Sequence, residues 1–84
     1  MAIVKSFYGD ERKRFLLKAI KYAIKMEEEG IFDKKEVDEF IKKVLNRKFS
    51  KQKANISLSF KNEEEYKKFK KLLNKYDKKL KMKM

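Results

Sequence analysis

The stretch Asn55-Ile56-Ser57-Leu58-Ser59-Phe60 decides the class of fold, because polar and apolar side chains alternate along it. This period of two predicts a β-strand with one buried face and one solvent-facing side. A single strand leaves its backbone N–H and C=O groups without partners, so this strand has to pair. The only other β-prone run, residues 2–8, stops at Gly9. We expect these two segments to pair; the alternative is pairing with the same strand of a second chain.

Helical patterns fill the rest of the chain, and each begins at an N-terminal signal. Asp10 is placed to cap a first helix, which Gly30 ends. The segment Asp33-Lys34-Lys35-Glu36 has capping-box spacing and opens a second helix over about residues 34 to 47 or 48. The segment Asn62-Glu63-Glu64-Glu65 repeats that spacing and opens a third helix.

The predicted fold is therefore α+β and mostly helical, with the order β-α-α-β-α and three helices on a minimal two-stranded sheet. Residues 1–84 are too few for two domains, so we expect a single small domain whose basic tail, residues 81–84, frays. Apolar side chains at helical spacing predict the core. On the first helix they are Phe15, Leu16, Ala19, Ile20, Tyr22, Ala23, Ile24 and Met26.

Missing residue types exclude several kinds of chemistry. The chain has no cysteine and no histidine, which excludes disulfides, thiolate zinc sites, cysteine nucleophiles and imidazole bases. A magnesium-dependent nuclease would need carboxylates brought together, but the acids lie at helix ends, where capping or solvation explains them. The two isolated glycines form no phosphate-binding loop. We expect no enzyme, with no catalytic residues, no metal ligands and no cofactor.

The sequence also argues against a membrane protein. No apolar run approaches the roughly 20 residues that a membrane-spanning helix needs. The N-terminal residues lack the pattern of a signal peptide. We therefore expect a cytoplasmic protein without a membrane partner.

Positive charge exceeds negative charge by a wide margin. The chain has 25 Lys and Arg against 13 Asp and Glu, a formal net charge of +12. This surplus favours a polyanionic partner, because lysines that contact phosphates release condensed counterions. On the first helix, four basic residues share the side opposite the apolar face. They form a ridge of Arg14, Lys18, Lys21 and Lys25. The second helix instead pairs its charges, as Asp38–Lys42 and Glu39–Lys43.

The third helix has the largest excess of basic over acidic residues. Its candidate phosphate contacts are Lys67, Lys68, Lys71, Lys75 and Lys78. We therefore expect a small basic protein that binds DNA or RNA through the phosphate backbone, with little sequence specificity because lysines outnumber arginines. The alternative is an accessory subunit that binds a protein partner in a replication, transcription or translation complex.

Tyrosines add a second possible kind of contact with nucleic acid. Tyr8 lies beside Gly9 at the end of the first strand, and is the best-placed tyrosine to stack on an unpaired base. The other three lie on apolar stripes and are expected in the core. They are Tyr22, Tyr66 and Tyr76.

Overall fold

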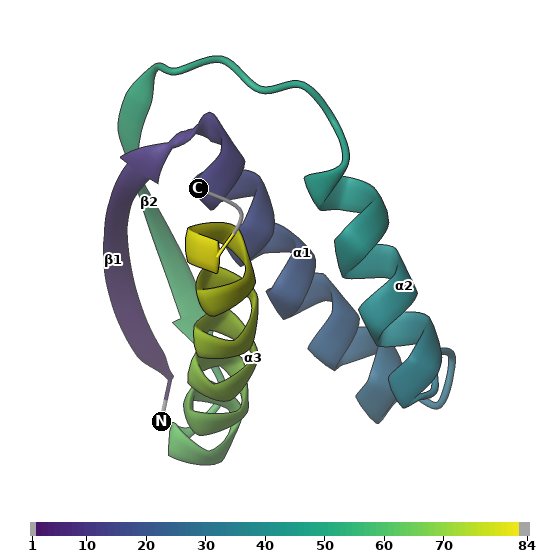
Figure 1. Ribbon diagram of the computed structural model, residues 1–84. Helices are drawn as coiled ribbons and strands as arrows, with labels where there is room; N and C mark the ends of the chain where they lie inside the picture. The colour runs from purple at the N-terminus through teal and green to yellow at the C-terminus, as the bar shows by residue number, and fades with distance from the viewer. Residues whose placement is uncertain (1, 83–84) are drawn as a thin grey trace.

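The strands and helices occur in the predicted order. The computed structural model describes residues 2–82, with the side chains of residues 2–76. Its elements are β1 (Ile3–Asp10), α1 (Glu11–Glu28), α2 (Lys34–Leu45), β2 (Lys53–Phe60) and α3 (Glu63–Met82) (Figure 1). The α+β fold is confirmed. Of the predicted tail, residues 81–82 belong to α3, and residues 83–84 lie outside the described part of the chain.

The sheet forms within one chain. β1 and β2 pair antiparallel over their full length, with Ile3 opposite Phe60 and Asp10 opposite Lys53. Alternate residues of the two strands pack on the helices. The large apolar ones are Ile3, Phe7, Ile56, Leu58 and Phe60. Both strands are therefore amphipathic, as the alternation in residues 55–60 predicts.

The other face of the sheet is turned away from the helices. It is mostly polar, and the hydroxyl oxygens of Ser6 and Ser57 lie 3.3 Å apart across the two strands. Two larger side chains on this face are exposed, Val4 by 65% and Tyr8 by 61%. Tyr8 thus has the exposure that a stacking residue needs, on a surface without the predicted lysines.

Each helix begins at the predicted capping residue. Asp10 accepts a backbone hydrogen bond at the start of α1 (2.9 Å), and Asn62 accepts one at the start of α3 (3.0 Å). Asp33 and Glu36 form a complete capping box on α2, in which each side chain accepts from the other residue's backbone N–H. Gly30 follows α1 with a φ of 75°, a left-handed conformation that favours glycine.

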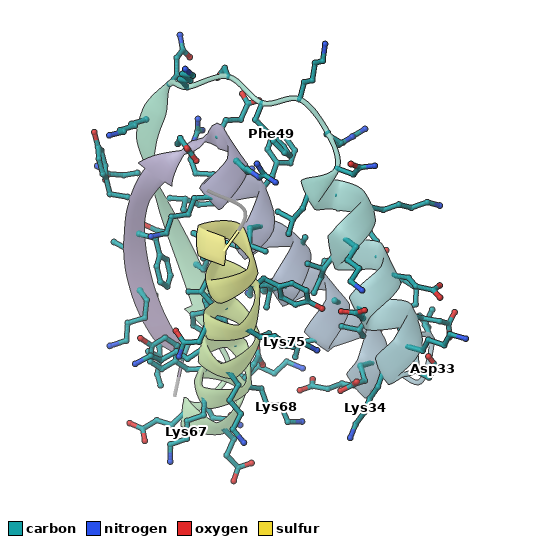
Figure 2. All side chains as sticks on the ribbon, viewed as in Figure 1. Asp33, Lys34, Phe49, Lys67, Lys68 and Lys75 are labelled. Atoms are coloured by element: carbon teal, nitrogen blue, oxygen red, sulfur yellow. The ribbon has the colours of Figure 1, made fainter. Side chains whose placement is uncertain are left out.

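A linker of residues 46–52 leads from α2 across the top of the molecule to β2 (Figure 1). Its Phe49 ring lies 5.4 Å from the ring of Phe15 at the start of α1 (Figure 2). The backbone N–H and the hydroxyl of Ser50 both donate to the Glu11 carboxylate, each at 3.2 Å. α2 ends at Leu45, before the predicted end at 47 or 48, and the linker crosses the N-terminal end of α1.

α1 lies at the centre of the molecule, in contact with the sheet, α2 and α3 (Figure 1). Aromatic rings join α3 to the sheet, since Phe69 lies 5.0 Å from Phe60 and 5.6 Å from Phe7 between ring centroids. The largest fully buried side chains come from four of the five elements. They are Tyr76, Phe60, Phe69, Leu16, Leu17, Ile20 and Ile41.

The buried side of α1 differs from the predicted one. Leu17 is fully buried, although it is outside the predicted apolar set. Phe15 and Tyr22 are 38% and 49% exposed, so the prediction that Tyr22 belongs to the core is wrong. The reason is that three neighbours cover α1, and their positions shift its buried sector away from these two rings and onto Leu17.

Within the described residues, no helix is both long enough and apolar enough to cross a lipid bilayer.

Candidate nucleic-acid interface

A groove of about 500 Å³ runs between α1 and the C-terminal end of β2. Basic side chains line it: Lys18, Lys21 and Lys25 from α1, and Lys61 from the turn between β2 and α3. The three α1 lysines share one helix face, because their spacing of three and four residues matches the helical period. The structure therefore brings together three of the four ridge residues, and adds Lys61, which the sequence did not indicate.

The floor of the groove holds one of these lysines in place. The ammonium of Lys21 lies 5.5 Å from the centre of the Phe60 ring, a cation–π geometry. Phe60 itself is buried, and Lys21 is half-buried. Lys18 and Lys25 extend from α1 on either side of this contact and are exposed. The lysine row therefore has one partly buried member between two exposed ones.

The groove keeps a surplus of positive charge. Two acids, Glu28 and Glu65, line it together with the four lysines. Among the side chains of residues 2–76, the only ion pairs within 4.0 Å are those of Asp38 with Lys42 (3.0 Å) and with Lys75 (3.9 Å). The groove lysines are thus unpaired within the described side chains, and their ammonium groups are available to an anionic ligand.

Arg14 continues the ridge in sequence but does not line the groove. Its guanidinium donates to the backbone carbonyl of Gln52 at 3.4 Å, and its Nε is buried. Arg14 therefore fastens α1 to the end of the linker. The sequence could not show this, because the position of the linker depends on the packing of α2.

The predicted α3 lysines lie outside the groove. The exposed ones are Lys67, Lys68, Lys71 and Lys75. Lys67 and Lys68 lie near the start of α3 and extend away from the core, whereas Lys75 lies further along the helix (Figure 2). Lys75 reaches Asp38 of α2. The side chain of Lys78 lies outside the described residues. The basic residues therefore form two surfaces, of which the groove is the concave one.

A second hollow, of about 860 Å³, has side chains from α1, α2 and α3 in its wall. It is the larger of the two, but its charges are mixed. They come from Arg12, Glu36, Glu39, Lys42 and Lys43. Arg12 also donates to the carbonyl of Leu45 at the end of α2 (3.4 Å). Because acids and bases both line this hollow, it is a weaker candidate for an anion than the groove is, and Arg12 already has a structural role.

α2 and α3 are joined at the edge of this hollow. The Tyr76 hydroxyl donates to the Asp38 carboxylate at 2.5 Å. This hydrogen bond, followed by the contact with Lys42 and the charge of Lys75, holds the pKa of Asp38 below its usual value. Burial, reinforced by Asp38, raises the pKa of Tyr76. The predicted Asp38–Lys42 pair is confirmed at 3.0 Å.

The predicted pair between Glu39 and Lys43 is not formed within 4.0 Å. Both side chains are exposed, so water solvates them at little cost.

Among the described residues, no three acids lie close enough together to hold a metal ion. Comparison with known proteins finds no family model, no curated protein and no solved structure that matches this chain. The geometry and charge of the groove are therefore the features from which a function can be inferred.

Proposed function

We propose that this protein is a small, non-catalytic, cytoplasmic nucleic-acid-binding protein whose groove lysines contact the phosphate backbone. The observation that carries the proposal is that Lys18, Lys21, Lys25 and Lys61 line one concave surface without an ion-pair partner among the described side chains. Such ammonium groups gain free energy when they displace counterions from phosphates. They act as point charges and lack the planar fork with which arginine reads bases, so binding has little sequence specificity.

The α3 lysines add to the field that attracts the ligand. The described ones are exposed and do not line the groove, so they contribute long-range attraction or contact a longer nucleic acid that wraps the molecule. Arg14 is left out of the proposed contacts, because its guanidinium is already bound to the Gln52 carbonyl.

The test removes charge from the groove alone. Replacing Lys18, Lys21 and Lys25 by Gln keeps helix propensity and removes three charges. If each lysine contacts a phosphate, the slope of log K against log[salt] for duplex DNA falls by about 2–3 units. Fluorescence anisotropy with a labelled duplex at several salt concentrations measures this slope, and circular dichroism checks that the variant is folded.

The matched control is the triple variant Lys34→Gln, Lys35→Gln, Lys48→Gln. These three lysines are exposed, do not line the groove and make no ion pair among the described side chains. The control should change the slope by less than about 1 unit, because it alters only the overall electrostatic field of the protein. Equal losses from both triples would show that net charge, without a localised site, causes binding. Failure of the unmodified protein to bind near physiological salt would favour the accessory-subunit alternative.

A further inference from the structure

Tyr22 lies among the lysines of the groove. It is 49% exposed, lines the groove, and on α1 it follows Lys21 and lies one helical turn from Lys18 and from Lys25. A single exposed ring is common on protein surfaces and by itself indicates no ligand. What distinguishes Tyr22 is that its ring lies among basic side chains that line the same groove.

The ring of Tyr22 is held in place from one side. Its centroid lies 5.4 Å from that of Phe40 and 6.4 Å from that of Phe32, the latter in an edge-on arrangement. Phe32 and Phe40 are themselves 5.7 Å apart, so the three rings form one cluster. Because its neighbours restrict its rotamers, Tyr22 loses little further conformational entropy when a ligand packs against it.

The other tyrosines lack this combination. Tyr76 is buried. The ring of Tyr66 is covered by the ammonium groups of Lys5 and Lys70, at 5.2 and 5.5 Å from its centre. Tyr8 is exposed, but on the outer face of the sheet, and it does not line the groove. Among the described residues, Tyr22 is the tyrosine that combines exposure with groove lysines.

This arrangement matches the chemistry of single-stranded nucleic acid. Proteins that bind single strands combine a basic groove along the backbone with aromatic rings on which bases stack. In a duplex the faces of the bases are covered by their neighbours, so a side chain on the surface cannot stack on them. We propose that the groove binds single-stranded DNA or RNA, with a base stacked on Tyr22 and phosphates held by the flanking lysines. This inference depends on the proposed function and specifies its ligand.

The test compares single-stranded and duplex ligands. Labelled oligo(dT), oligo(U) and a duplex of equal length are titrated with the unmodified protein and with Tyr22→Leu and Tyr22→Phe. Tyr22→Leu should weaken binding to the single strands by about 5- to 150-fold, the value of one base–aromatic stack, and binding to the duplex by less than about twofold. Tyr22→Phe keeps the ring and should bind as the unmodified protein does. Tyr8→Leu is the control for an exposed tyrosine outside the groove, and should change neither affinity.

A second measurement avoids the risk that Tyr22→Leu disturbs the aromatic cluster. The chain has no tryptophan, so its intrinsic fluorescence comes from its four tyrosines. Stacking of a base on Tyr22 should quench part of this emission when oligo(dT) binds, and the quenching should be reduced in Tyr22→Phe. Equal quenching in both proteins would overturn the inference.

The outcomes separate this inference from the proposed function. Stacking on Tyr22 is refuted if Tyr22→Leu weakens single-strand and duplex binding equally, or if it weakens neither of them. Either result leaves the proposed phosphate contacts of the groove lysines untouched. If the lysine triple variant leaves the salt slope unchanged, the groove itself is refuted.

Discussion

The hydroxyl of Tyr76 ends a buried side chain and donates to Asp38 at 2.5 Å, across the contact between α3 and α2. A hydrogen bond to a charged group contributes about 1.5–3 kcal/mol to stability when both partners are shielded from water. Asp38 is partly exposed, so water replaces some of the lost interaction when the hydroxyl is removed. The contribution here therefore lies at or below the lower end of that range.

Tyr76→Phe should destabilise the protein while leaving the fold unchanged. We expect a loss of about 1 kcal/mol, which corresponds to a decrease in Tm of about 4–8 °C for a domain of this size. Thermal unfolding followed by circular dichroism at neutral pH measures it. A Tm equal to that of the unmodified protein would show that water replaces this hydrogen bond completely.

The same pair predicts how stability depends on pH. The pKa of Asp38 is lowered from 3.8, so its contribution is complete above that value and is lost as the pH falls through the lower pKa of the folded state. The pKa of Tyr76 is raised from 10.0, so its contribution is complete below that value and is lost as the pH rises above it. The stability difference between the unmodified protein and Tyr76→Phe should therefore be largest between these limits and decrease on both sides. If the free energies of unfolding of the two proteins, plotted against pH, differed by the same amount at every pH, this prediction would be contradicted.

At the scale of single elements, capping residues define where the helices begin. Asp33 and Glu36 exchange hydrogen bonds at 2.8 and 3.1 Å at the start of α2. α2 is the shortest of the three helices, with 12 residues, so its first turn is a large share of its length. Its stability depends on this box and on packing against α1.

Asp33→Ala should lower the free energy of unfolding by about 1 kcal/mol, because the backbone N–H of Glu36 loses its acceptor. Asp33→Asn is the control, since asparagine caps nearly as well and should retain most of the stability. Urea unfolding gives both values from the transition midpoints. Similar losses in the two variants would indicate that the charge of Asp33, rather than its capping geometry, is what stabilises α2.

The elements could be predicted from the sequence because their signals are local. Asp10, Asp33 and Asn62 mark the helix starts through contacts with residues only three positions away. The exposure of Tyr22 could not be predicted in this way. The helical period shows on which face of a helix a side chain lies. It does not show which element packs against that face, and this decides whether the side chain is buried.

The groove could be predicted only in part, for a similar reason. The α1 lysines were evident from their spacing, whereas Lys61 joins them because β2 runs antiparallel to β1 and ends beside α1. The engagement of Arg14 with Gln52 likewise depends on where the linker lies. Contacts between distant segments follow from packing, and a sequence pattern contains no direct record of them.

At the scale of the whole molecule, the net charge of +12 acts against the compact state. Like charges on a small surface repel, and the described side chains offset this with ion pairs to Asp38 alone. Salt screens such repulsion over about 10 Å at 0.1 M. If the proposed function holds, bound nucleic acid would neutralise the same charges and would stabilise the folded protein.

Added salt should therefore stabilise the free protein. We expect the Tm to rise as sodium chloride increases from a low concentration to physiological ionic strength, although nucleic-acid binding weakens over the same range. The lysine triple variant has a lower net charge, and its Tm should rise less. Differential scanning fluorimetry of both proteins tests this, and a Tm that falls with salt would show that attraction, not repulsion, dominates the surface.

The antiparallel sheet also affects the order in which the protein can fold. It joins Ser6 and Ser57, which are 51 residues apart in the chain, whereas α1 and α2 are neighbours joined by a short turn. Contacts between nearby segments form early, and contacts that close a long loop form late. On the ribosome, β1 emerges before both helices, yet its hydrogen-bonding partner is made only after them. The first strand to be synthesised is thus left with an unpaired backbone until β2, which follows both helices in the chain, has been made.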